Sequence, residues 1–190
     1  MIDLTKGSRI NLSKEAPGAT RFALGLGWDV RITDGAEFDL DASALLLDAN
    51  GKPVGGTSSL VFYGQQSSPC GGVVSSGDNR TGDGDGDDET LTVDLSKINS
   101  DIEKIVLVVT IHEADVRGQN FGMVNNAYVR ILQDDKEQPV ARYDLSEDYS
   151  VETAVIFGEL YKKDGDWRFA AKGDGFAGGL AAFLKGYGLQ

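Results

Sequence analysis

Residues 38–46 read Phe-Asp-Leu-Asp-Ala-Ser-Ala-Leu-Leu, with an apolar side chain at every second position. Alternation with a period of two is typical of a β-strand that has one face against a core. The segment Asp-Ala-Asn-Gly at 48–51 is a turn signal that ends the stretch. The pattern therefore predicts a strand whose Phe38, Leu40 and Ala42 face the core, while Asp39 and Asp41 face the other way.

Eight further short segments have strand-like patterns. Runs of Gly, Asp and Asn separate them, and the Asp-Gly pair at 164–165 suits a tight hairpin. The segments cover residues 22–28, 60–63, 91–95, 104–111, 127–133, 138–145, 155–161 and 167–171. About nine short strands at this spacing predict a mainly β fold, a two-sheet antiparallel β-sandwich.

Helix signals are few. The residues that recur at the spacing of one helical face are Phe176, Leu180, Phe183, Leu184 and Tyr187. They predict a short helix near the C-terminus. A second helical turn is expected within residues 96–102, so the fold has only a few short helices.

The chain has 190 residues, 41% apolar side chains and a net charge of −12, which predicts one domain over residues 1–190. An acidic surface repels phosphate, so we expect no nucleic-acid partner and only indirect membrane association. The apolar runs are too short to span a bilayer, and the first residues do not resemble a secretory signal. With a lone cysteine, Cys70, these features predict a cytoplasmic location. They do not predict an oligomeric state.

The densest charge cluster lies in residues 78–89. Its carboxylates belong to Asp78, Asp83, Asp85, Asp87, Asp88 and Glu89. Two unit charges ~4 Å apart repel by about 4 kcal/mol at an effective dielectric near 20, so a compact loop of this kind needs a counter-ion. Calcium takes about 6–8 hard oxygen ligands, and the interleaved glycines let the backbone turn around it. The alternative is a flexible, hydrated acidic loop.

We expect Asp39 and Asp41 to lie opposite this loop, with their carboxylates turned toward it. They share one strand face about 6.5–7 Å apart, and Asp is depleted in strands. The alternative is an ordinary polar face turned to solvent. The loop is not an EF-hand, because positions 6 and 12 counted from Asp83 are Asp88 and Asp94 instead of Gly and Glu.

Signatures of catalysis are weak. Carboxylates among Asp39, Asp41 and Glu113 could serve glycoside hydrolysis, but so acidic a cluster binds a cation first and no aromatic sugar platform is evident. His112 is the only histidine and lacks a nucleophile motif, and Cys70 lacks a partner for redox chemistry. One Cys and one His do not make a zinc site. We therefore expect a protein that is not an enzyme.

Several motifs, among them residues 120–122 and 126–131, resemble one known family. Five others carry most of the resemblance. They are Gly-Leu-Gly-Trp-Asp at 25–29, Phe-Asp-Leu-Asp-Ala-Ser at 38–43, Gly-Asp-Asn-Arg-Thr-Gly-Asp-Gly-Asp-Gly-Asp-Asp-Glu at 77–89, Ile-His-Glu-Ala at 111–114 and Phe-Gly-Glu-Leu-Tyr at 157–161. Over nearly its whole length the chain resembles the TerD family of tellurium-resistance and stress-response proteins. The resemblance implies a single TerD-like β-sandwich domain that binds two calcium ions at an acidic cluster.

The same resemblance implies a set of calcium ligands in this sequence. They are Asp39, Asp41, Asp78, Asn79, Asp83, Asp85, Asp87, Asp88 and Glu89. Glu113 is an additional candidate from a neighbouring strand. The resemblance implies the set and does not assign ligands to individual ions.

The sequence thus predicts a non-enzymatic calcium-binding protein of a tellurite-resistance or general stress-response system. Calcium is expected to order the loop at 78–89, which another protein of that system then recognises. Two alternatives stay open. One is a C2-like module that docks on membranes through calcium, although no basic or aromatic rim accompanies the loop. The other is a scaffold subunit that uses the ion for stability alone.

Overall fold

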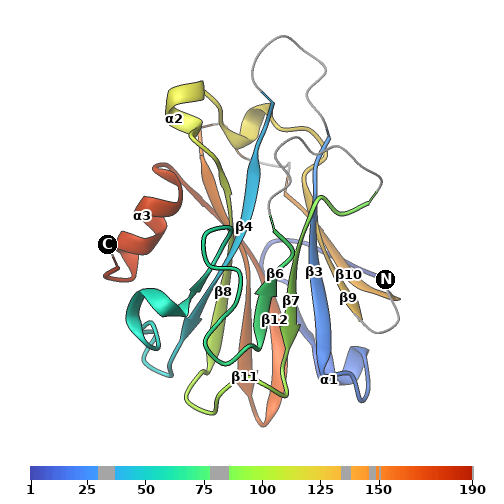
Figure 1. Ribbon diagram of the computed structural model, residues 1–190. Helices are drawn as coiled ribbons and strands as arrows, with labels where there is room; N and C mark the ends of the chain where they lie inside the picture. The colour runs from blue at the N-terminus through green and yellow to red at the C-terminus, as the bar shows by residue number, and fades with distance from the viewer. Residues whose placement is uncertain (30–36, 78–85, 134–137, 146–148, 150, 190) are drawn as a thin grey trace.

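Two six-stranded β-sheets pack face to face (Figure 1) in the computed structural model. The structure describes residues 1–29, 37–77, 86–133, 138–145, 149 and 151–189. The first sheet consists, in spatial order, of β1 (Ile2–Leu4), β10 (Gln138–Asp144), β9 (Tyr128–Gln133), β3 (Arg21–Gly27), β7 (Glu89–Asp94) and β6 (Val73–Ser75). Its strands are antiparallel to their neighbours, except that β1 lies parallel to β10.

The second sheet is antiparallel throughout. It consists, in spatial order, of β2 (Arg9–Asn11), β12 (Asp166–Phe176), β11 (Ala154–Lys163), β8 (Lys104–Ile111), β4 (Leu40–Leu47) and β5 (Leu60–Val61). The helical segments are short: α1 (Leu12–Glu15), η1 (Gly56–Ser59), α2 (Ala114–Arg117), η2 (Phe121–Met123) and α3 (Gly179–Gly186).

The predicted mainly β, two-sheet fold with a C-terminal helix is confirmed. All nine expected segments contain strands, and β8 has the expected bounds of 104–111. Strands β1, β2 and β6 were not predicted, because three residues are too few to show a period. Phe176 ends β12 instead of opening the helix, since left-handed Gly178 (φ 95°) separates the two elements. Residues 96–102 form turns without a helix.

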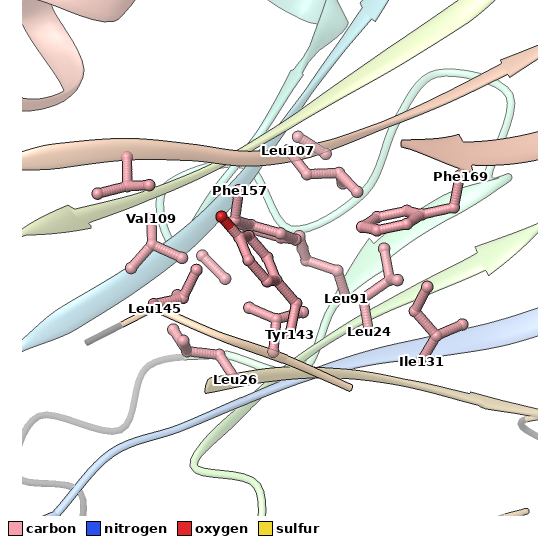
Figure 2. Packing of buried hydrophobic residues seen from close by; sticks show 14 of the residues in the cluster. Leu24, Leu26, Leu91, Leu107, Val109, Ile131, Tyr143, Leu145, Phe157 and Phe169 are labelled. Atoms are coloured by element: carbon pink, nitrogen blue, oxygen red, sulfur yellow. The ribbon is translucent and has the colours of Figure 1, made fainter. Parts of the chain in front are cut away.

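The main core lies between the two sheets. Figure 2 shows Leu24, Leu91 and Ile131 of the first sheet packed toward Phe157 and Phe169 of the second. The strand at 38–46 contributes its apolar face to this core, as its alternation predicts, through Phe38, Leu40, Ala42, Ala44 and Leu46. Burial of these side chains from both sheets holds the layers together.

A second apolar cluster covers the outer face of the second sheet. There α3 packs Phe183 against Leu45, Leu47 and Val108, and Phe176 stacks on Phe183 with ring centroids 6.4 Å apart. Strands β4 and β8 are therefore buried on both faces, which explains the almost continuous apolar run of β8. This covering puts Leu45 and Leu47, on the outward face of β4, out of reach of bulk water.

Replacement of Phe157 by Ala should lower the free energy of unfolding by about 3–5 kcal/mol, since the ring is fully buried between the sheets. Urea denaturation followed by circular dichroism measures the loss. Val74→Ala is the matched control, because Val74 is an exposed strand residue, and it should cost less than about 1 kcal/mol. Similar losses for the two variants would contradict the assignment of the main core.

Candidate functional site

The predicted acidic segments meet at one end of the sandwich. Register pairs Leu40 of β4 with Ile111 of β8, and Leu26 of β3 with Glu89 of β7. Figure 1 shows α2 capping this end. We call it the α2 end. It gathers the starts of β4 and β7 and the ends of β3 and β8.

Glu89 joins the two sheets at the α2 end. Its side chain lies on the core-facing side of the first sheet, next to Leu26, and is almost fully buried. Its Oε2 accepts a 2.8 Å hydrogen bond from the backbone N–H of Ala42 in the second sheet. Strand β5 pairs only with Ala44 and Leu45, so Ala42 lies beyond the reach of that edge strand. The carboxylate thus satisfies a buried backbone donor and fixes the end of the 78–89 segment beside β4.

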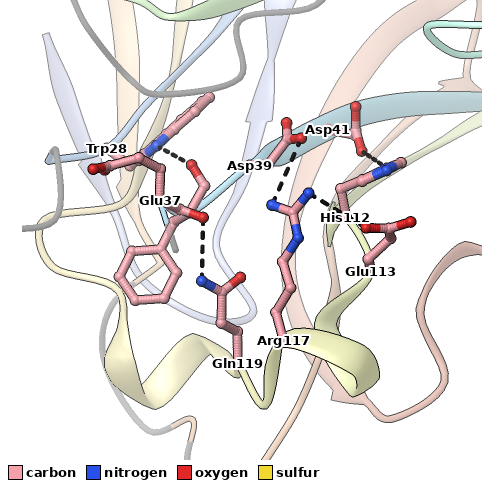
Figure 3. Close-up of polar contacts among 9 residues, drawn as sticks. Trp28, Glu37, Asp39, Asp41, His112, Glu113, Arg117 and Gln119 are labelled. Carbon is pink, nitrogen blue, oxygen red and sulfur yellow. Dashed lines mark hydrogen bonds and ion pairs between the residues drawn. The ribbon is translucent and has the colours of Figure 1, made fainter. Parts of the chain in front are cut away.

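Asp88 continues the attachment along β3. Its backbone N–H donates to the carbonyl of Leu26 at 2.8 Å, and its Oδ2 accepts from the N–H of Trp28 at 3.0 Å. The indole Nε1 of Trp28 in turn donates to the carbonyl of Phe38 at 3.2 Å, as Figure 3 shows. Segment 87–89, the end of β3 and the entry to β4 therefore form one hydrogen-bonded unit.

Asp39 and Asp41 are buried, with 3% and 4% of their surfaces exposed, so the predicted alternative of a solvent-facing polar strand is wrong. Both lie near basic side chains at the α2 end (Figure 3). Asp41 Oδ2 is 3.7 Å from His112 Nδ1, and Asp39 Oδ2 is 4.0 Å from Arg117 Nη1. The backbone carbonyl of Asp39 also accepts from the N–H of His112 at 2.8 Å.

Glu113 is more exposed than these two residues. Its side chain is 57% exposed, and its Oε2 lies 3.5 Å from Arg117 Nη2, one turn along α2. Its backbone adopts the left-handed region (φ 51°) at the start of α2. Arg117 therefore stands between Glu113 and Asp39 as a shared positive charge.

Asp87 lies on the opposite face of the first sheet from Glu89. It forms an ion pair with Arg130 of β9, with Oδ1 and Nε 2.7 Å apart. Its carboxyl group occupies the space above Gly25, where a Cβ would come within 1.9 Å of Oδ2. Gly25 is the register partner of Arg130. Because Gly25 has no side chain, the ion pair between Asp87 and Arg130 lies directly against the backbone of β3.

Tyr128 holds the backbone next to Asp87. Its hydroxyl donates to the carbonyl of Gly86 at 2.8 Å, and its ring lies against Gly27 and under the guanidinium of Arg142 at 3.9 Å. Burial, followed by the negative charge of Asp87, raises the pKa of the Tyr128 phenol. Burial lowers the pKa of Arg130, but the Asp87 carboxylate more than offsets this and raises it overall.

The structure thus places the described candidates in three groups. Asp39, Asp41, Asp88 and Glu89 lie on the hydrogen-bonded unit of the α2 end, Glu113 lies on its outer rim, and Asp87 lies across β3. The candidates Asp78, Asn79, Asp83 and Asp85 are outside the described residues. Within the described ranges, no cluster of three or more His, Cys, Asp or Glu side chains is arranged to hold a metal ion.

Sequence reasoning missed Arg117, Arg130 and Tyr128. A signal was present for the last two, because glycines at 25 and 27 inside a strand mark a close approach by other groups. For Arg117, the spacing of four from Glu113 is an ion-pair spacing on a helix. Neither signal names the carboxylates that these cations meet across strands.

Comparison with known proteins gives a consistent result. The TerD domain model matches residues 1–187. The chain is 53% identical over 189 residues to the tellurium resistance protein TerD of Serratia marcescens, covering 100% of this chain and 98% of that one. It is 50% identical over 190 residues to general stress protein 16U of Bacillus subtilis, with the same coverage.

A solved structure agrees with the fold. A crystal structure of a homologue of the telluride resistance protein TerD from Streptomyces coelicolor superimposes with a TM-score of 0.73 at 26% identity, covering 88% of this chain and 96% of that one. Among the described residues, no helix is both long and apolar enough to cross a membrane.

Loss of the Arg130 cation should destabilise the protein by about 1–3 kcal/mol, because it leaves the Asp87 carboxylate mostly buried without its partner. Unfolding of Arg130→Met, Asp87→Asn and the double variant measures the coupling between them. The matched control is Arg168→Met, whose partner Asp164 is 71% exposed, and it should cost less than about 1 kcal/mol. Additive losses at positions 87 and 130 would contradict a direct ion pair.

Tyr128 should titrate above pH 10, the value for an unfolded chain. Because the folded pKa is the higher one, its contribution to stability is complete below pH ~10 and is lost as the pH rises through the folded value. A pH titration of the Tyr128 ¹³Cζ resonance tests this. In Asp87→Asn the pKa should fall toward 10 while burial keeps part of the shift. A midpoint at or below 10 in the unsubstituted protein would contradict the arrangement.

Proposed function

The chain belongs to the TerD family, and from that premise we propose that it is a non-enzymatic calcium-binding protein of a tellurium-resistance or stress-response system. Calcium bound at the α2 end orders the acidic segment 78–89. The ordered segment then forms a surface that another protein of the same system recognises.

One observation carries the proposal: the hydrogen bond from Ala42 to Glu89. It brings the end of the acidic segment into contact with the strand that holds Asp39 and Asp41. The strand with one anionic segment and the described end of the other, joined between residues 47 positions apart in sequence, thus share one end of the fold. Repulsion opposes this juxtaposition, and a divalent cation relieves it.

The chemistry of the donors fits calcium. All ten candidate side chains offer carboxylate or amide oxygen, the hard ligand that calcium prefers, and none offers nitrogen or sulfur for coordination. Asp39 lies 4.0 Å from the guanidinium of Arg117, so the carboxylates of this end already have a cation nearby. When bound, calcium supplies two positive charges and a centre that several oxygens can share.

Each candidate ligand has a role in this proposal. Asp39, Asp41, Asp88 and Glu89 are the ligands on the fold, and Asp78, Asn79, Asp83 and Asp85 are the ligands that the loop brings. Asp87 anchors the loop through Arg130 on the other face of β3, and Glu113 contributes from the rim.

Surroundings of the reactive side chains favour a protein that is not an enzyme. His112 faces the carboxylate of Asp41 at 3.7 Å and the ring of Tyr63, with centroids 6.0 Å apart. Cys70 Sγ lies 3.4 Å from Ser68 Oγ and forms no disulfide. Neither arrangement is a nucleophile paired with a base and an orienting group.

Isothermal titration of the purified protein with CaCl₂ should show saturable binding that raises the melting temperature. At a calcium concentration a hundredfold above Kd the gain is about 2.7 kcal/mol. Asp41→Asn and Asp88→Asn should each weaken binding by about tenfold or more, because each removes a charged ligand. Asp144→Asn, an exposed carboxylate paired with Arg142 on the first sheet, is the matched control and should bind as the unsubstituted protein does.

Equal melting temperatures in calcium and in chelator would overturn calcium binding. Binding that persists in both ligand variants would move the site away from the α2 end. The recognition step is tested by capturing proteins of the same stress-response system with and without calcium. If the protein binds calcium but captures the same proteins in both conditions, the ion has a purely stabilising role and the recognition step is overturned.

A further inference from the structure

A cleft of about 270 Å³ opens between α2, the end of β8 and the first turn of α3. We call it the α2–α3 cleft. Its walls include Tyr63, Glu113, Asp115, Val116, Thr153 and Leu180. This volume is below the range of about 300–1,000 Å³ that holds cofactors and drug-sized ligands, and it suits one large side chain.

The charge of the α2–α3 cleft has one dominant sign. The ionisable groups among its lining residues are three carboxylates, from Asp41, Glu113 and Asp115, the imidazole of His112 and the phenol of Tyr63, with neither Lys nor Arg in the described lining. Glu113 is paired with Arg117 outside the lining, at 3.5 Å. Asp115, in the first turn of α2, has no ion-pair partner within the described part of the chain. A positively charged group entering the cleft therefore meets complementary charge.

Tyr63 gives the cleft an aromatic wall. The ring follows β5, is 43% exposed, and is held edge-on between Phe62 and His112 at centroid distances of 5.0 and 6.0 Å. An exposed ring fixed beside carboxylates is the combination that binds cationic side chains, since the ring face attracts positive charge. The apolar walls accommodate the methylene stem of such a side chain.

The first turn of α3 does not turn this cleft into an anion site. The N–H groups of Gly178 and Gly179 both donate to Thr153 Oγ1, at 3.1 and 3.2 Å. They are thus directed at a neutral hydroxyl instead of at the cleft. On the rim, Val116 is 87% exposed, which gives a larger partner an apolar contact beside the charged pocket.

We propose that the α2–α3 cleft binds a lysine or arginine side chain of a partner polypeptide. The side chain inserts its stem between Tyr63 and Leu180 and places its cationic head near Asp115, while Val116 contacts the neighbouring residues of the partner. The proposal does not depend on bound calcium, because none of these four residues is among the proposed calcium ligands.

NMR titration of the ¹⁵N-labelled full chain, in buffer with chelator, tests the cleft separately from calcium binding. The probes are acetyl-Gly-Lys-Gly-amide, acetyl-Gly-Arg-Gly-amide, acetyl-Gly-Gln-Gly-amide and putrescine. The lysine and arginine peptides should shift the amide signals of residues 111–116 and 178–181, saturating at concentrations on the order of 10 mM. The glutamine peptide should leave them unchanged.

Two variants locate the contact. Tyr63→Leu keeps apolar bulk without a ring face and should weaken binding by about two- to fivefold, as an exposed cation–π contact predicts. Asp115→Asn should weaken it to a similar extent. Asp101→Asn removes the same charge from an exposed turn outside the cleft and should leave binding unchanged. Thermal melting of each variant confirms that it is folded.

Three results would overturn the proposal. The first is an absence of saturable shifts with either cationic peptide. The second is equal binding of the glutamine peptide, or binding that neither variant weakens. The third is tighter binding of putrescine than of both peptides, which would make the ligand a free amine instead of a polypeptide side chain.

Discussion

The buried carboxylate of Glu89 connects the two sheets at the α2 end, where the acidic residues of the candidate site lie. Glu89 starts from one sheet and accepts from the backbone of Ala42 in the other. A buried backbone donor and a buried carboxylate each cost free energy when alone, and each satisfies the other here. The hydrogen bonds from Trp28 to Asp88 and to Phe38 continue this connection at the same end of the sandwich.

Sequence patterns were sufficient for the layers and insufficient for their polar contacts. The alternation at 38–46 identified the core face of β4, but it could not show that α3 covers Leu45 and Leu47 on the other face. Helix and strand meet through residues more than 130 positions apart. The almost continuous apolar run of β8 indicates burial on both faces, since a strand with one solvent-exposed face would alternate between apolar and polar residues.

Asp87 and Glu89, two carboxylates of the same acidic segment, lie on opposite faces of the first sheet. Asp87 points across β3 toward Arg130, whereas Glu89 points into the sandwich. The pleat of a strand sends side chains two apart to the same face, so an opposite placement means that regular strand geometry begins only at Glu89. A count of charges along the chain therefore overstates how many can converge on one point. Register with β9, which the sequence does not reveal, selects the carboxylate that pairs.

Both sheets end in very short strands: β1 and β6 in the first sheet have three residues each, and β2 and β5 in the second have three and two. Long unpaired edges invite intermolecular sheet extension and fibrous aggregation, whereas such brief edges offer few backbone groups to a second chain. In the second sheet, β5 and β2 cover only short parts of the longer strands β4 and β12, so a chain that added a strand there would meet a stepped margin instead of one straight edge. Such a step interrupts the long flat edge that sheet extension needs.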